Sequence, residues 1–484
     1  MIIGNVALDG SGVLFDIELA GSAIASITPA GQRRSLGDEV LDGGGGVALP
    51  GFVDSHVHLT QWAAARRRID VGPALSAADA VALVYPYART AGDSVVRANG
   101  FRDAHWPEEP HKDLLENALP GVRVAMTSMD LHTLWLSPAL LGDLGIDHPT
   151  GVLRDVDGLE AVMALEEQED PAELDRAVLD ATAVLAVRGV TGVVDFEFAD
   201  NRTVWDRRLS AGSPAVRVDT TVWPQWLDEA LDLGERTGDV SALSELIRRG
   251  PLKVMLDGSL NTRTACCHDR YPGVDGDDAY GLLLETRESL FELVSRASRG
   301  GIVPAIHAIG DRANGLALDA FEHAGCGGRI EHAQQVLPED IARFAALGVA
   351  ASVQPQHAMS DRDIAEHLWS GRRSVGYGYG SLYRSGATLL FGSDAPVSPP
   401  EPLAGVAAAV FRTDDDRPAW HPEEAVPLDA SLRAASGGRG VLRVGDAADI
   451  VVLVEHPEHR SVHDLADTEI RATICAGALT HAAV

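Results

Sequence analysis

His56 and His58 have a spacing that suits metal binding. Pro50-Gly51 interrupts the chain just ahead of them, and the apolar, β-branched run that follows predicts a buried strand. Because side chains alternate between the two faces of a strand, Asp54, His56 and His58 point the same way. Two imidazoles about 7 Å apart on one strand face can bind one metal ion together. Taken alone, such a pair is more often two core or surface histidines.

Four more polar residues stand at the ends of apolar, strand-like runs farther along the chain. They are Lys253, His307, His332 and Asp394. Each of them alone is more often structural, for instance a core histidine or an aspartate that caps a helix. Together with the histidine pair they make six suitable side chains on the first, fourth, fifth, sixth and eighth predicted strands. The pattern therefore predicts one shared metal site.

Lys253 is unusual because lysine is nearly absent from this chain. Of 40 basic residues, only Lys112 and Lys253 are lysine. The apolar neighbours of Lys253 predict burial, which is costly for an unpaired ammonium group. One explanation is an ion pair with Asp257 or Asp394. The other is addition of CO₂ to the amine, which gives a carbamate whose two oxygens bridge two metal ions and which arginine cannot form.

The candidate ligands need an architecture that brings strand ends together. Eight apolar runs predict strands at Phe52–His58, Val190–Phe196, Val216–Val222, Leu252–Leu256, Ile302–His307, Arg329–His332, Val349–Gln354 and Thr388–Gly392. Helical patterns separate most of them, for example Asp311–His323 and Pro338–Leu347. Strands that alternate with helices form parallel βαβ units, and eight such units predict a (β/α)₈ TIM barrel. Active sites of this fold lie at the carboxyl ends of the strands.

The two ends of the chain and one long gap predict additions to the barrel. Short alternating runs with turn signals predict a small β-sandwich domain built from residues 1–48 and 437–484, around a barrel of residues 49–436. The gap after the first strand predicts a large insertion at about residues 60–189 that covers the active-site face. It carries His132 and Trp135, and an ordinary surface excursion is an equal alternative.

Composition narrows the class of protein. A net charge of −31 over 484 residues argues against nucleic acid and anionic membranes as partners. The N-terminus has no signal-peptide pattern, and no stretch approaches the length of a membrane span. Four cysteines without framework spacing predict a reducing, cytoplasmic location. We expect a small-molecule substrate, and a homodimer is one option for the assembly.

The sequence resembles the amidohydrolase superfamily, specifically its amidohydrolase-3 or YtcJ-like group, which includes N-substituted formamide deformylases. The motifs that carry this resemblance are Gly51–His58, Asp257-Gly258-Ser259, His307–Ala313, Arg329–Gln334, Gln354–His357 and Gly392–Val397. The resemblance implies a divalent metal held by His56, His58, His307, His332 and Asp394, with Lys253 as a possible bridge in carbamylated form. Zinc suits these ligands best, and manganese and iron are alternatives.

The expected reaction is metal-dependent hydrolysis of a C–N bond, most simply an amide. The metal lowers the pKa of bound water toward about 7 and polarises the substrate carbonyl. Asp394 takes the proton of this water and later delivers it to the leaving nitrogen. Expected substrate contacts are His132, Trp135 and His357, and an apolar N-substituent is expected at Trp135, Trp223 or Trp226. Plain packing is an even alternative for the tryptophans.

Two other functions are alternatives to amide hydrolysis on this scaffold. A hydrolytic deaminase on the same scaffold usually has a glutamate three residues after the histidine of the fifth strand, where this chain has Gly310. A non-catalytic binding protein with the same barrel would have lost a ligand, and none is missing. Cys266 and Cys267 stand where relatives carry apolar or small residues. An extra pair of metal ligands is one interpretation of them, and inert buried thiols are another.

Overall fold

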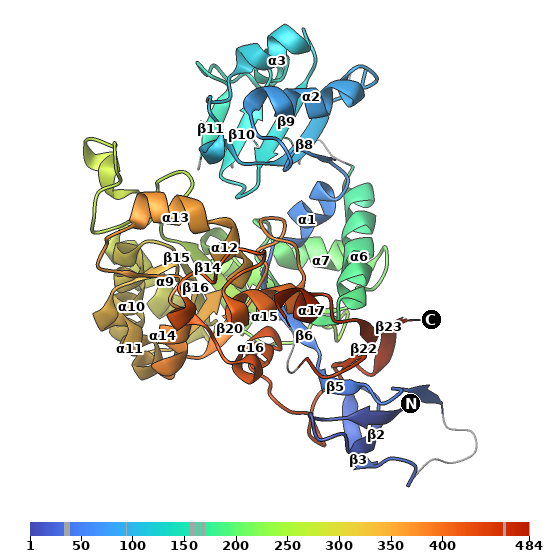
Figure 1. Cartoon of the computed structure of the whole chain (residues 1–484). Coiled ribbons are helices and arrows are strands. Elements are labelled where there is room, and N and C mark those ends of the chain that lie inside the picture. Colours follow the sequence, from blue (N-terminus) through green and yellow to red (C-terminus); the bar gives the residue numbers. More distant parts are fainter. Residues whose placement is uncertain are drawn as a thin grey trace.

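Eight parallel strands form the central sheet of the protein (Figure 1). The computed structural model describes residues 1–32, 39–92, 94–154, 170–457 and 461–483, together with Gly158, Ala161 and Leu165. The strands are β6 (Phe52–Val57), β12 (Val190–Asp195), β13 (Arg217–Val222), β14 (Ile247–Met255), β15 (Pro304–Ala308), β16 (Gly328–His332), β18 (Val349–Val353) and β20 (Leu389–Phe391). Just beyond β20, the Asp394 amide donates to the His56 carbonyl at 2.7 Å, which brings the last strand against the first. The predicted TIM barrel is confirmed.

Helices alternate with the barrel strands. They include α6 (Pro171–Val187), α7 (Asn201–Leu209), α8 (Leu227–Asp232), α9 (Arg287–Gly300), α10 (Asp311–Ala324), α11 (Pro338–Leu347), α15 (Pro402–Phe411) and α16 (Leu428–Ala435). Three of these helices end at a glycine in the left-handed conformation, Gly301, Gly325 and Gly348, with φ of 86°, 63° and 66°. Glycine adopts this conformation without a steric penalty and ends a helix abruptly. The next strand therefore begins within a few residues.

One strand is longer than predicted. β14 begins at Ile247, because Arg248 and Arg249 belong to the strand although their charges do not fit an apolar run. Arg248 donates to Asp219 at 2.7 Å, and Arg249 pairs with Glu235 at 2.7 Å. Acidic residues on neighbouring segments thus neutralise the two arginines, whose charges had made this part of the sequence look unlike a strand.

The two ends of the chain meet in a second eight-stranded sheet. From the N-terminal side come β1 (Ile2–Ala7), β2 (Leu14–Ala20), β3 (Ala23–Pro29), β4 (Val40–Asp42) and β5 (Val47–Pro50), and from the C-terminal side β21 (Ile450–Leu453), β22 (Ile470–Cys475) and β23 (Ala478–Ala482). β21 pairs with β5 in the antiparallel direction. Because β5 leads directly into β6, this sheet is joined to the start of the barrel.

Between β6 and β12 the chain forms a third sheet of five strands. Its order is β11-β10-β9-β8-β7, with β7 (Ile69–Asp70), β8 (Val96–Phe101), β9 (Val124–Ser128), β10 (Thr133–Leu136) and β11 (Val152–Arg154). The helices α2 (Ala77–Ala88) and α3 (Lys112–Ala118) pack on it around an apolar core of their own. Figure 1 shows this insertion on one side of the barrel, with the terminal sheet on the other. None of the described helices is long and apolar enough to cross a membrane.

Candidate metal centre

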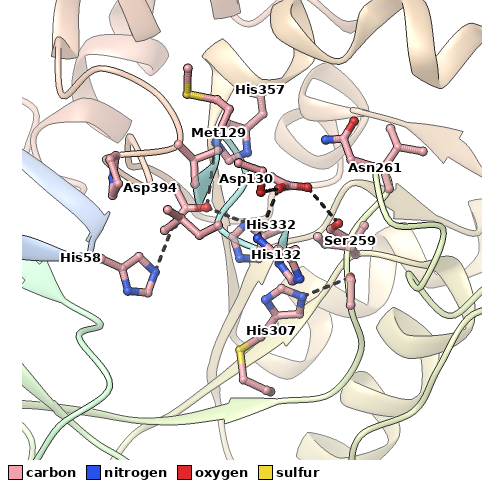
Figure 2. A pocket seen from close by; sticks show the side chains of 18 of the residues that line it. His58, Met129, Asp130, His132, Ser259, Asn261, His307, His332, His357 and Asp394 are labelled. Atoms are coloured by element: carbon pink, nitrogen blue, oxygen red, sulfur yellow. Dashed lines mark hydrogen bonds and ion pairs between the residues drawn. The ribbon is translucent and has the colours of Figure 1, made fainter. Parts of the chain in front are cut away.

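Three predicted ligands lie close enough to share one metal ion. His56, His332 and Asp394 are buried, and their ligand atoms lie within 4.8 Å of one another. Asp394 Oδ1 lies 3.5 Å from His56 Nε2 and 3.3 Å from His58 Nε2. Figure 2 shows His58, His332 and Asp394 around the same space. His56 belongs to the first strand, His58 follows its end, and Asp394 follows the last strand, so closure of the barrel builds this cluster.

The protonation states of these groups suit a cation. Burial lowers the pKa of His56 and His332 well below the usual value, so both imidazoles are neutral. Burial favours the protonated form of Asp394, but the hydrogen bond and the positive charge of His58 outweigh it and hold the pKa of this carboxyl well below its usual range. For His58, burial lowers the pKa, but contact with Asp394 outweighs this and raises it. The contact between His58 and Asp394 therefore favours a positive charge at this place. A metal ion carries such a charge, and it binds to neutral imidazoles and ionised carboxylates.

Partners behind the histidines fix their orientation. His56 Nδ1 donates to Glu331 Oε2 at 2.6 Å, and Arg329 holds the same carboxylate. His332 Nδ1 donates to Gln354 Oε1 at 2.9 Å. Because Nδ1 carries the proton in each ring, Nε2 is the nitrogen that remains to bind a metal.

Two of the candidate ligands have a strained backbone. His332 and Asp394 have φ of 74° and 58°, in the left-handed region that residues other than glycine rarely adopt. Asp54 helps to hold the second of them, because it accepts hydrogen bonds from the Ser393 amide at 2.9 Å and the Ser393 hydroxyl at 2.5 Å. Asp54 therefore fixes the loop that carries Asp394 and does not line the cavity.

Lys253 lies beside the cluster without an anionic partner. Its side chain is 1% exposed, and Nζ lies 3.5 Å from His56 Nε2 and 4.6 Å from the centre of the Phe196 ring. Among the described residues no carboxylate lies within 4.0 Å of this nitrogen, so neither ion pair considered from the sequence forms. Burial lowers the pKa of Lys253 to about 8, which increases the fraction of neutral amine. The side chain thus has the form that can react with CO₂.

Asp257 has a structural role that occupies both of its oxygens. They accept hydrogen bonds from the backbone amides of Cys266, Ile309 and Gly310 at 2.8, 3.0 and 2.9 Å. His307 Nε2 lies 3.5 Å from Asp257 Oδ1, and its ring centre lies 4.5 Å from that of His332. The carboxylate therefore ties the loop after β14 to the loop after β15, beside His307.

The cluster lies in a cavity of about 460 Å³, a size that suits a small-molecule ligand. All six predicted ligands line it, and so do His132 and His357. Two ring nitrogens at the site, His58 Nδ1 and His357 Nε2, are buried without a hydrogen-bond partner in the described part of the chain. A buried polar atom without a partner costs roughly 1–3 kcal/mol, so this site favours a bound group that satisfies it.

Trp135 does not reach the cavity, which corrects the expectation that it contacts substrate. It is fully buried in the core of the insertion, with ring centres 6.3 Å from Phe101 and 6.4 Å from Trp106. Trp223 does line the cavity, next to Phe198 at 4.5 Å between ring centres, whereas Trp226 does not line it.

Cys266 and Cys267 are buried outside the cavity lining. Burial raises the pKa of the Cys266 thiol to about 12 and that of the Cys267 thiol to about 11. Thiolates are the form that binds metal, so these residues behave as inert core groups.

Sequence reasoning assigned no role to Glu331, Gln354 or Asp130. Glu331 is a charged residue inside a short apolar strand, which could have indicated its role. Gln354 stands at the end of a strand and begins the Gln354–His357 motif. Asp130 lies in a loop between two strands of the insertion, where no local pattern indicates that it lines the cavity.

A parallel barrel whose carboxyl ends hold neutral imidazoles and an ionised carboxylate is the architecture of a metal-dependent hydrolase. The family model described as "Amidohydrolase family" matches residues 39–481. The chain therefore belongs to the amidohydrolase family.

Three relatives match along most of their length. Protein LONG AFTER FAR-RED 3 of Arabidopsis thaliana is 28% identical over 84% of this chain and 78% of that protein. Putative amidohydrolase YtcJ of Bacillus subtilis is 26% identical over 90% and 89%. N-substituted formamide deformylase of Arthrobacter pascens is 27% identical over 92% and 90%. The resemblance to the YtcJ-like group is thereby confirmed.

Several solved structures are similar along nearly the whole chain, and one of them has a high TM-score. It is an uncharacterized metal-dependent hydrolase from Pyrococcus horikoshii, with a TM-score of 0.79 and 25% identity over 96% of this chain and 99% of that one. The similarity supports both the barrel and a divalent metal.

Proposed function

We propose that this protein hydrolyses the C–N bond of a small amide. The observation that carries the proposal is the convergence of six polar side chains on one cavity at the carboxyl end of the barrel. His56, His58, His307, His332 and Asp394 would hold one or two divalent ions, with zinc as the best match, and carbamylated Lys253 would bridge them. When bound, such an ion lowers the pKa of a coordinated water and polarises the substrate carbonyl. The four free cysteines agree with a cytoplasmic location.

Asp394 is the group we assign to proton transfer. Its carboxylate is ionised, and Oδ2 lies 3.9 Å from His357 Nε2 and 4.0 Å from His332 Nδ1, farther than a hydrogen bond. An oxygen without a close donor can accept a proton from the attacking water and pass it to the leaving nitrogen. His357 and His132 line the same cavity and are proposed to contact the substrate.

An apolar wall gives the cavity a place for a substituent of the amide. Trp223, Phe198, Met255, Leu282 and Leu284 contribute to this wall. Burial of an aromatic or alkyl group against it is favourable by roughly 25 cal/mol per Å². We propose that the apolar N-substituent of the amide binds here.

The packing at Gly310 argues against deamination. A Cβ atom at this position would lie 2.0 Å from the Cys266 carbonyl oxygen, so no glutamate fits without a shift of the backbone. The Asp257 carboxylate holds both segments in place. The residue that would protonate a leaving amine in a deaminase is therefore absent and sterically excluded.

The metal ligands can be tested by elemental analysis. We expect wild-type protein to retain divalent metal through purification, and a His56→Ala, His58→Ala double variant to lose most of it. This variant lacks two of the predicted ligands. The matched control is His367→Ala, His463→Ala, which removes two exposed histidines that are not predicted to bind metal. Equal metal content in wild type and in the first variant would rule out this ligand set.

The reaction class can be tested with a library of linear amides, cyclic amides, aminopurines and aminopyrimidines. We expect release of carboxylate and amine from small N-acyl or N-formyl amides, because Asp394 is the only proton carrier we assign. Protein with Asp394→Asn, purified in parallel, controls for contaminating hydrolases. Release of ammonia from the aromatic amines alone would show that the protein is a deaminase.

A further inference from the structure

The loop between β9 and β10 enters the cavity from the insertion. Its four residues, Met129 to His132, all line the cavity, and Figure 2 shows Asp130 and His132 directed toward the space that His307 and His332 share. His132 lies close enough to Asp257 and His307 to influence their pKa values. The insertion therefore contributes side chains that would contact a ligand bound next to the metal centre.

The Asp130 carboxylate is held in place with one oxygen free to accept further hydrogen bonds. Oδ1 accepts from the Ser128 hydroxyl at 2.6 Å and from the His132 amide at 3.2 Å. Among the described residues, Oδ2 has one long contact, 3.4 Å from the hydroxyl of Ser259 on the barrel. A carboxylate oxygen can accept about two hydrogen bonds, so Oδ2 retains capacity toward the cavity.

Other groups around Asp130 also favour a donor. Asp361 lines the cavity and lies close enough to Asp130 for their charges to interact. His357 is 5% exposed, and its Nε2 atom is buried without a partner among the described residues. Arg102 lines the same side, but its side chain is exposed, so solvent screens its charge. Asp130 and Asp361 thus add acceptors to a cavity that also has the apolar wall of Trp223 and Phe198.

We propose that Asp130 is a specificity-determining residue that binds a hydrogen-bond donor, an amine or a hydroxyl, on the substrate. The inference rests on the proposed amide hydrolysis and specifies its substrate class. The substrate is an amide that carries a donor group in addition to its apolar substituent. Ser259 is a positioning residue, because it links the loop of the insertion to the barrel.

Three substrates of nearly equal shape test this inference. N-benzylpropanamide, N-benzylglycolamide and N-benzylglycinamide differ only in a terminal methyl, hydroxyl or amino group. We expect kcat/KM of wild-type protein to be roughly 10- to 100-fold higher for the last two than for the first, as for a hydrogen bond to a charged group. Asp130→Asn should reduce this ratio below about threefold. Asp103→Asn is the matched control, because this carboxylate lines the same cavity but is paired with Arg154 at 2.6 Å.

The outcomes separate this inference from the proposed function. Equal kcat/KM for the three amides in wild type, or an equal loss for all three in Asp130→Asn, would overturn the role of Asp130. Calorimetry with Asp394→Asn protein measures binding of the same amides without turnover. Tighter binding of the amine-bearing amide by a protein that hydrolyses none of them would support the role of Asp130 and refute only amide hydrolysis.

Discussion

Replacement of Asp394 by asparagine is expected to lower kcat/KM by at least roughly 10²–10⁴-fold, the usual contribution of general acid–base catalysis. The amide keeps the size of the side chain but cannot accept the proton that we propose the ionised carboxylate takes. Asparagine also removes the negative charge that faces His56 and His58 at 3.5 and 3.3 Å, so metal content should fall as well. Steady-state kinetics and elemental analysis on the same preparation measure both effects.

Trp223→Leu is the control for this experiment. Trp223 lines the cavity but is not one of the predicted ligands, so its loss should lower kcat/KM far less than the loss of Asp394. A fully metallated Asp394→Asn protein with undiminished turnover would exclude Asp394 as the proton carrier.

Lys253→Ala is expected to abolish most activity and to lower the metal content by about one ion per chain. In the proposed carbamylation, the neutral amine would add to CO₂. A new N–C bond would form as one C=O π bond becomes a C–O⁻ group, and a proton would leave the nitrogen to give the carbamate. The environment suits this reaction, since Nζ is buried, has no carboxylate within 4.0 Å in the described part of the chain, and has a pKa lowered by burial to about 8. Short-chain carboxylic acids should restore part of the activity of Lys253→Ala, because their two oxygens replace those of the carbamate.

The other lysine of the chain is a matched control. Lys112 lies in the insertion, where Nζ donates to the His148 carbonyl at 2.5 Å. Lys112→Arg should retain activity and metal, whereas Lys253→Arg should lose both, because arginine forms no carbamate. A carbamate signal in carbon NMR after growth with labelled bicarbonate should be present in Lys112→Arg and absent in Lys253→Arg. Full activity of Lys253→Arg would refute the bridge.

The sequence by itself was sufficient to predict the barrel and the residues at its mouth. Apolar runs and turn residues are local signals, and all eight predicted strands correspond to strands of the sheet. Parallel strands end at the same edge of a barrel, so polar residues at their ends were bound to converge. That reasoning placed His56 beside Asp394, although 338 residues separate them in the sequence.

Only the tertiary structure decided which side chains reach the cavity from the insertion. Every residue of β10 is buried, so alternation along the strand could not distinguish the face toward the core from a face toward the substrate, and Trp135 proved to be a core residue. Asp130 lines the cavity because the loop between β9 and β10 reaches the barrel, where Asp130 contacts Ser259, and a contact between such remote segments leaves no local pattern. The sequence left the partner of Lys253 undecided for the same reason, since backbone amides of its own loop and of the loop after β15 occupy Asp257. Residue types and spacing determine what chemistry a chain can perform, whereas contacts between remote segments determine which groups remain free to perform it.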